Sequence, residues 1–109
     1  MSLFAITDMI EYCETDPFKP SCGRGEVILV TKALYGRMRR GKCIQKSYGT
    51  CHVDVTALLD RKCSGRPSCD VIVSRLVPDD MQPCDRDFRS YLEAAYECVT
   101  GELTQIRFF

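Results

Sequence analysis

Residues 26–37 have the sequence EVILVTKALYGR, and this stretch predicts the central strand of the fold. It follows the turn-forming run Gly23-Arg24-Gly25 and is rich in β-branched residues, which favours an extended strand over residues 26–34. Because side chains alternate along a strand, one face is expected to carry Val27, Leu29, Thr31 and Ala33, and the other Ile28, Val30, Lys32 and Leu34. The run Tyr35-Gly36-Arg37 then follows the end of the strand.

Shorter patterns predict the remaining elements. A helix is expected over residues 53–63, with Asp54 as its cap and Gly65 and Pro67 as its end. Strands are expected over 69–76 and 91–98, weaker ones over 11–13 and 18–22, and a turn-rich loop over 78–87. The 109 residues suffice for one domain, of class α+β, with a small antiparallel sheet and one or two short helices.

Eight cysteines are the most informative part of the composition. No C-x-x-C pair occurs, and the single histidine, His52, lies beside Cys51. Zinc ligands usually come as close pairs, so we expect four disulfides and no metal or cofactor. Disulfides indicate an oxidising compartment, and residues 1–6 lack the features of a secretory signal. We therefore expect a piece of a larger secreted or membrane-anchored protein.

Charge and motif content exclude several functions. Lysine and arginine total 15, as do aspartate and glutamate, so a globally basic nucleic-acid-binding protein is not expected. No apolar run reaches the ~18–20 residues of a membrane span. A single histidine limits acid–base catalysis, and no phosphate-binding glycine loop occurs. The carboxylate pairs Asp79-Asp80 and Asp85/Asp87 lie in the turn-rich loop, where carboxylates are usually solvated. The chain is predicted not to be an enzyme.

Three features point to binding instead. Tyr35-Gly36-Arg37 offers a ring, a sharp turn and a fork of donors, the mixture that sugars need. The run RMRRGK over 37–42 forms a compact basic segment suited to sulfate or carboxylate groups. Gln82-Pro83-Cys84 leads into a loop with further bases. Each also has a purely structural explanation: a turn glycine between a core tyrosine and a surface arginine, a solvated loop, and an anchored connection.

The cysteine order and two local motifs resemble the sea urchin egg lectin-like domain family, which includes rhamnose-binding lectins and the lectin domain of latrophilins. The matching residues are Cys13-Glu14, Tyr35-Gly36-Arg37, CSGRPSC over 63–69 and YLEAAYEC over 91–98. The resemblance covers residues 11–99, which leaves an N-terminal segment over 1–10 and a tail over 100–109. It implies an antiparallel sheet of about five strands with one to three short helices.

The resemblance also implies disulfide pairs and a sugar site. The pairs are Cys13–Cys43, Cys22–Cys98, Cys51–Cys84 and Cys63–Cys69. The candidate carbohydrate-binding residues are Glu14, Tyr35, Gly36, Arg37, Gln82 and Ser90. The first disulfide should bring Glu14 near the residues after Arg37, and Tyr35 and Arg37 are expected to lie close to Glu14 at one end of the sheet. Leu34, Gln82 and Ser90 stand where the family has Asn, Asp and Lys, which removes groups that would hold sugar hydroxyls.

Added bases make the chain similar to the family's heparin-binding neuronal Slit co-receptor branch. These bases, the predicted basic patch, are Arg39, Arg40, Lys42, Arg86 and Arg89, with Arg37 beside them. The leading hypothesis is an extracellular carbohydrate-recognition module that binds a heparan sulfate-like glycan in preference to the monosaccharides rhamnose or galactose. The alternative is a protein–protein adhesion module that keeps the fold, has lost sugar binding and takes an extracellular protein as partner. No nucleic acid is expected as a partner.

Overall fold

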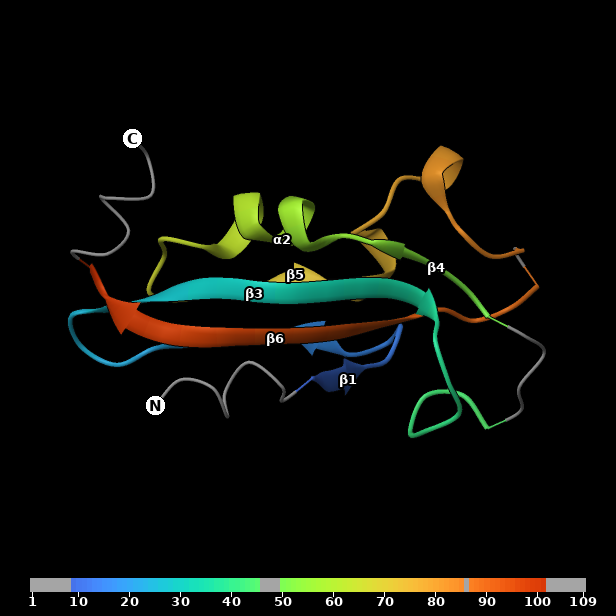
Figure 1. The fold of residues 1–109 in the computed structure, drawn as a ribbon, viewed down its shortest axis with the longest axis horizontal. Coiled ribbons are helices and arrows are strands. Elements are labelled where there is room, and N and C mark those ends of the chain that lie inside the picture. Colours follow the sequence, from blue (N-terminus) through green and yellow to red (C-terminus); the bar gives the residue numbers. More distant parts are fainter. Residues whose placement is uncertain (1–8, 46–49, 86, 102–109) are drawn as a thin grey trace.

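The computed structural model describes residues 9–45, 50–85 and 87–101, and a four-stranded antiparallel sheet in the order β1-β6-β3-β4 forms its centre (Figure 1). Its strands are β1 (Ile10–Tyr12), β3 (Glu26–Arg37), β4 (Cys51–Asp54) and β6 (Tyr91–Thr100). A second sheet pairs β2 (Pro17–Phe18) with β5 (Val71–Ile72). One α-helix, α2 (Thr56–Cys63), and 3₁₀ turns at Val73–Arg75 and Asp79–Met81 complete the described part, which confirms the predicted class.

A bulge in β3 overturns the simple alternation predicted for this strand. Val30 pairs with Tyr96 and Lys32 with Ala95, so Thr31 is the extra residue opposite β6. Before the bulge the buried apolar side chains are Ile28 and Val30, whereas after it they are Ala33 and Tyr35. One inserted residue moves the core face from even to odd positions, because side chains alternate with a period of two. Tyr35 therefore faces inward, and β3 continues to Arg37 rather than ending at residue 34.

The predicted helix begins three residues later than expected. Val53 and Asp54 belong to β4, a strand that the sequence pattern did not indicate, and they pair with Tyr35 and Leu34 of β3. Thr56 then starts the helix. Its backbone N–H donates to Asp54 Oδ1 at 2.8 Å, and its hydroxyl accepts from the Ala33 N–H at 2.9 Å. Pairing with the long neighbouring strand outweighs the helical spacing of the apolar residues here.

The strand predicted over residues 69–76 is mostly absent. Only Val71–Ile72 is extended, and a 3₁₀ turn follows at once. Its partner β2 is equally short, because Pro17 lacks a backbone donor and Pro20 follows closely. The weak predictions over 11–13 and 18–22 correspond to β1 and to β2 with an isolated Ser21–Ser68 bridge.

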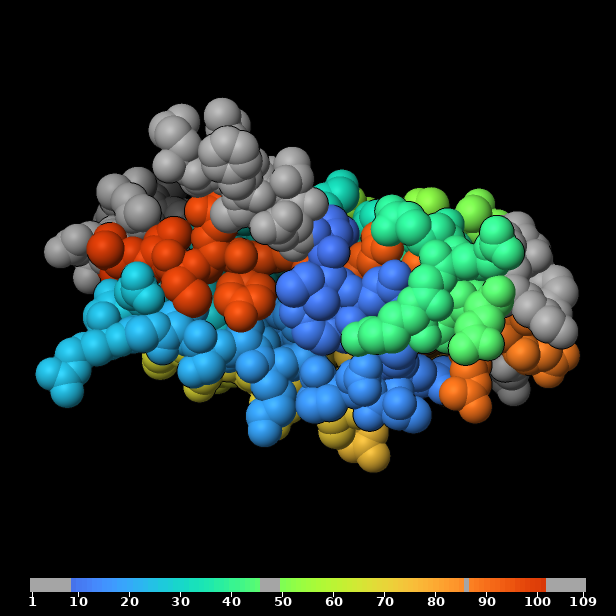
Figure 2. All heavy atoms as spheres, turned by 90° about the horizontal axis from the view of Figure 1, so that it is seen from below, coloured from blue at the N-terminus to red at the C-terminus, as the bar shows by residue number. Residues whose placement is uncertain are grey.

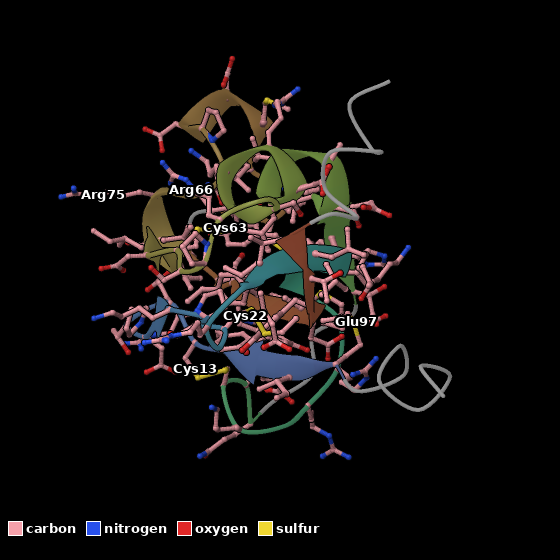
Figure 3. All side chains as sticks on the ribbon, turned by 90° about the vertical axis from the view of Figure 1, so that its left-hand side faces the viewer. Cys13, Cys22, Cys63, Arg66, Arg75 and Glu97 are labelled. Atoms are coloured by element: carbon pink, nitrogen blue, oxygen red, sulfur yellow. A yellow bond between two sulfur atoms is a disulfide. The ribbon has the colours of Figure 1, made fainter. Side chains whose placement is uncertain are left out.

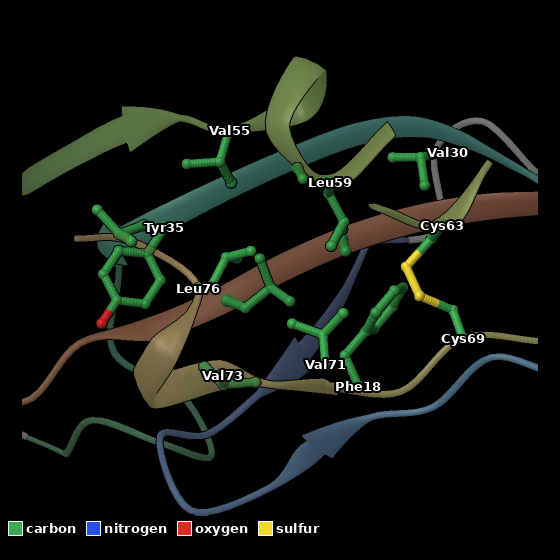
Figure 4. Close-up of a cluster of buried hydrophobic side chains, with 14 of the residues drawn as sticks. Phe18, Val30, Tyr35, Val55, Leu59, Cys63, Cys69, Val71, Val73 and Leu76 are labelled. Atoms are coloured by element: carbon green, nitrogen blue, oxygen red, sulfur yellow. A yellow bond between two sulfur atoms is a disulfide. The ribbon is translucent and has the colours of Figure 1, made fainter. Parts of the chain in front are cut away.

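The apolar core lies between the long β3–β6 pair and the layer formed by α2, β5 and the first 3₁₀ turn (Figure 4). Phe18, Leu59 and Val73 are fully buried there, and Phe18 contacts Tyr12 edge-on with ring centroids 4.9 Å apart. The cysteines form the four disulfides that the resemblance implied, Cys13–Cys43, Cys22–Cys98, Cys51–Cys84 and Cys63–Cys69. Among the described residues, no helix is long and apolar enough to cross a membrane.

Candidate functional site

Four of the six predicted sugar-site residues line one cavity at an end of the central sheet. The cavity has a volume of about 530 Å³, and Glu14, Tyr35, Gln82 and Ser90 come to it from four separate segments. Ser74, Asp79, Cys84, Asp85 and Phe88 complete its wall. Three carboxylates and no base line it among the described residues, so we call it the acid-lined cavity.

A short turn and a disulfide position Glu14. The Asp16 N–H donates to the Cys13 carbonyl at 2.9 Å, and the Asp16 side chain accepts from the Cys13 N–H at 3.0 Å. The Cys13–Cys43 disulfide fastens this turn to the segment that follows β3. Figure 2 shows the blue segment that includes this turn beside the green segment near residues 38–45. A carboxylate in the cavity wall can accept hydrogen bonds from the hydroxyl groups of a ligand.

The Tyr35 hydroxyl reaches the cavity from the core. The residue is only 2% exposed, and its hydroxyl points away from the apolar cluster (Figure 4). The pKa of Tyr35 lies above its ordinary value, chiefly because the ring is buried; the Glu14 charge adds to this shift, and interactions with Gln82 and Ser90 oppose it. Gln82 is itself oriented because its Nε2 donates to the Val77 carbonyl at 2.8 Å. The Gln82 side chain is therefore held in place before any ligand arrives.

Gly36 and Arg37 do not line this cavity, although the resemblance placed them in the site. Gly36 has φ +138°, and a Cβ there would lie 2.2 Å from the Cys51 carbonyl oxygen, so its role is to let β4 approach. Arg37 is 6% exposed, and its Nη1 donates to the Arg89 carbonyl at 2.8 Å. Its guanidinium carbon lies 5.2 Å from the Phe88 ring centroid. Arg37 thus supports the loop that carries the cavity wall.

The predicted basic patch does not form a single free cationic surface. Arg39 forms an ion pair with Glu93, whose carboxylate is buried, and Lys42 lies 4.0 Å from Asp16. Arg40 and Arg89 are exposed, whereas Arg86 lies outside the described residues. Arg37, which the sequence places beside this patch, is buried.

Sequence reasoning missed two sets of residues. Asp79, Asp85 and Phe88 line the acid-lined cavity; their place in a disulfide-anchored loop was the available indication. A second set surrounds a groove of about 560 Å³ between α2 and β5, which we call the basic groove. Its bases are Arg61, Lys62, Arg66 and Arg75. Figure 3 shows Arg66 and Arg75 on the same side of the molecule. Arg61, Lys62 and Arg66 lie close together in the sequence, whereas Arg75 joins them from the 3₁₀ turn after β5, which the sequence alone does not indicate.

Comparison with known proteins agrees with this geometry. Residues 20–98 match the D-galactoside/L-rhamnose binding SUEL lectin domain. The chain is 31% identical over 99 residues to adhesion G protein-coupled receptor L1 of Homo sapiens and of Bos taurus, which covers 85% of this chain and 6% of each relative. It is 29% identical over 97 residues to latrophilin Cirl of Drosophila persimilis, with 84% of this chain and 6% of the relative covered. The chain belongs to the SUEL lectin domain family.

Proposed function

We propose that this chain is an extracellular, non-enzymatic carbohydrate-recognition module that binds a neutral sugar in the acid-lined cavity. One observation carries the proposal: Glu14, Tyr35, Gln82 and Ser90 meet in a cavity with three carboxylates and no base among the described residues. Carboxylate, amide and hydroxyl groups match the hydrogen-bonding needs of sugar hydroxyls, and the volume falls in the ~300–1,000 Å³ range of ligand sites. The domain boundaries 11–99 are part of this proposal.

The charge of the cavity determines which sugars fit. Glu14, Asp79 and Asp85 would repel a sulfate or carboxylate held among them, because like charges at short range raise the free energy of the complex. The sequence-based preference for a sulfated glycan therefore has no support from the residues of this cavity. Rhamnose or galactose is the better occupant, despite the substitutions at Leu34, Gln82 and Ser90.

Titration calorimetry with methyl rhamnoside and methyl galactoside tests the proposal. Glu14→Gln should weaken binding roughly 10- to 100-fold, because a hydrogen bond to a charged acceptor is worth about 1.5–3 kcal/mol. Asp80→Asn is the matched control, since this exposed carboxylate lies in the neighbouring 3₁₀ turn but does not line the cavity. Affinity should change little between low and high salt. An equal effect of the two substitutions would contradict the assignment.

A second candidate function, sulfated-glycan binding, is favoured by the basic groove. Arg61, Lys62, Arg66 and Arg75 make no ion pair among the described residues, in contrast to Arg39 of the predicted basic patch. Retention on a heparin column should fall for the double substitution Arg66→Gln/Arg75→Gln. If Arg40→Gln lowers retention as much, the groove is not the site. Binding of neither sugar nor heparin would favour the protein-adhesion alternative, which the names of the adhesion-receptor relatives also support.

A further inference from the structure

A second hollow adjoins the acid-lined cavity at Phe88. This hollow has a volume of about 350 Å³, and its lining includes Arg37, Gln45, Asp87 and Arg89. Phe88 is 37% exposed and lines both hollows, so its ring forms part of a common wall. A ligand held in the cavity and extending past this ring would enter the second hollow.

The Phe88 ring is held firmly enough to serve as a platform. Arg37 lies over the ring at 5.2 Å from its centroid, and the Arg37 side chain is fixed by its hydrogen bond to the Arg89 carbonyl. The Phe88 N–H also donates to the Asp85 carbonyl at 3.0 Å, which closes a turn. An aromatic ring held in this way offers its remaining surface for packing against the apolar C–H groups of a sugar.

The two hollows differ in charge. Glu14, Asp79 and Asp85 make the cavity negative. Among the described residues that line the second hollow, the charged groups are the guanidinium groups of Arg37 and Arg89 and the carboxylate of Asp87. Arginine binds carboxylate and sulfate through charge-assisted hydrogen bonds. The second hollow therefore suits a sugar unit that carries an anionic group, while the cavity suits a neutral one.

We propose that the binding site has two subsites and takes a disaccharide or a longer glycan. A neutral terminal sugar occupies the acid-lined cavity, and the next unit, carrying a sulfate or a carboxylate, lies beyond Phe88 beside Arg89. This inference rests on the proposed function, because the first unit must bind in the cavity. It adds the second unit, its anionic group and the residues that select it.

Four probes test the inference by calorimetry on the oxidised full chain. They are methyl galactoside, a neutral disaccharide with terminal galactose, the same disaccharide sulfated on its second unit, and its counterpart with a uronic acid as second unit. Packing on Phe88 should make the neutral disaccharide about 2- to 10-fold tighter than the monosaccharide. One exposed charge pair should add about 1.5- to 5-fold for an anionic probe. Whichever anionic probe is tighter identifies the group.

Two variants, Arg89→Gln and Gln45→Ala, and one control, Arg40→Gln, separate the subsites. Arg89→Gln should remove only the anionic advantage and leave the monosaccharide unchanged, whereas Arg40→Gln, an exposed base outside both hollows, should change neither. Gln45→Ala should reduce the advantage of the neutral disaccharide. Equal affinity of monosaccharide and disaccharides, or equal effects of the two arginine substitutions, overturns the second subsite alone. If the monosaccharide itself does not bind, the proposed function fails, and the inference fails with it.

Discussion

Replacing Gly36 by alanine tests how closely β4 must approach β3 to shape the site. The new Cβ would lie 2.2 Å from the Cys51 carbonyl oxygen and 2.7 Å from the His52 Cα, distances far below any real contact. Cys51 has little freedom to withdraw, because its disulfide to Cys84 fixes it to the cavity wall. The backbones of β3 and β4 must therefore separate around this position.

The expected cost has two parts. Alanine at φ +138° carries backbone strain of about 1–3 kcal/mol. If separation of the strands breaks two backbone hydrogen bonds, at ~0.5–1.5 kcal/mol each, the total becomes about 2–6 kcal/mol. Gly25→Ala is the matched control, since Gly25 has φ +79° but a Cβ added there would meet nothing within 4 Å. It should show the strain alone, about 1–3 kcal/mol.

Guanidinium unfolding of the oxidised protein measures both costs. The chain has no tryptophan, so far-UV circular dichroism and tyrosine fluorescence are the signals. The free energy of unfolding should fall in the order parent, Gly25→Ala, Gly36→Ala, with similar denaturant slopes if the unfolded state is unchanged. Equal destabilisation by the two substitutions would refute the reasoning, because the overlap with Cys51 would then contribute nothing.

Three further predictions concern charged side chains. Arg39→Gln should lower the free energy of unfolding by about 1–2 kcal/mol, because the substitution leaves the buried Glu93 carboxylate without its cation. The loss is smaller than for a fully buried ion pair because Arg39 is largely exposed. In the same denaturation assay, Arg40→Gln should leave the free energy of unfolding unchanged. The pKa of Asp54 is lowered to about 2 by its hydrogen bonds to Thr56 and Lys32, so its stabilisation is present above pH 4 and lost as pH falls toward 2. In thermal melts, the parent should be more stable than Asp54→Asn by at most ~1 kcal/mol, because the group is exposed. This difference should shrink as pH falls from 4 toward 2, and a difference that grows would contradict the assignment. In calorimetry with the monosaccharide, Arg37→Lys should weaken binding more than Arg89→Gln does. Lysine cannot both donate to the Arg89 carbonyl and cover the Phe88 ring as the guanidinium does.

The strand at 26–37 shows how far local pattern predicts this fold. Its β-branched run and the turn before it identify the strand, but the alternation of side chains cannot reveal the bulge at Thr31. The bulge depends on pairing with β6, which is far away along the chain. As a result, the sequence pattern placed Leu34 with the inward residues Ile28 and Val30, whereas the structure places Tyr35 there.

In the candidate site, too, one part could be predicted from the sequence and another could not. Glu14, Tyr35, Gln82 and Ser90 were named from a family resemblance, and the structure brings them to one cavity. The sequence could not predict which bases of the predicted basic patch are free to bind a ligand, because a run of bases does not reveal which of them face buried acids. Arg39 and Arg40 are adjacent in the chain, yet only Arg39 pairs with Glu93 among the described residues.

The run Tyr35-Gly36-Arg37 acts as one structural unit with three separate tasks. Tyr35 directs its hydroxyl into the acid-lined cavity, Gly36 admits β4 at close range, and Arg37 holds the loop that carries Phe88. None of these tasks depends on the identity of a ligand. The motif therefore predicts that a cavity exists at this end of the sheet, whereas the choice of ligand depends on residues that other segments bring to it. Glu14 and Asp85 on one side of Phe88 and Arg89 on the other are the residues whose substitution should change specificity without loss of the fold.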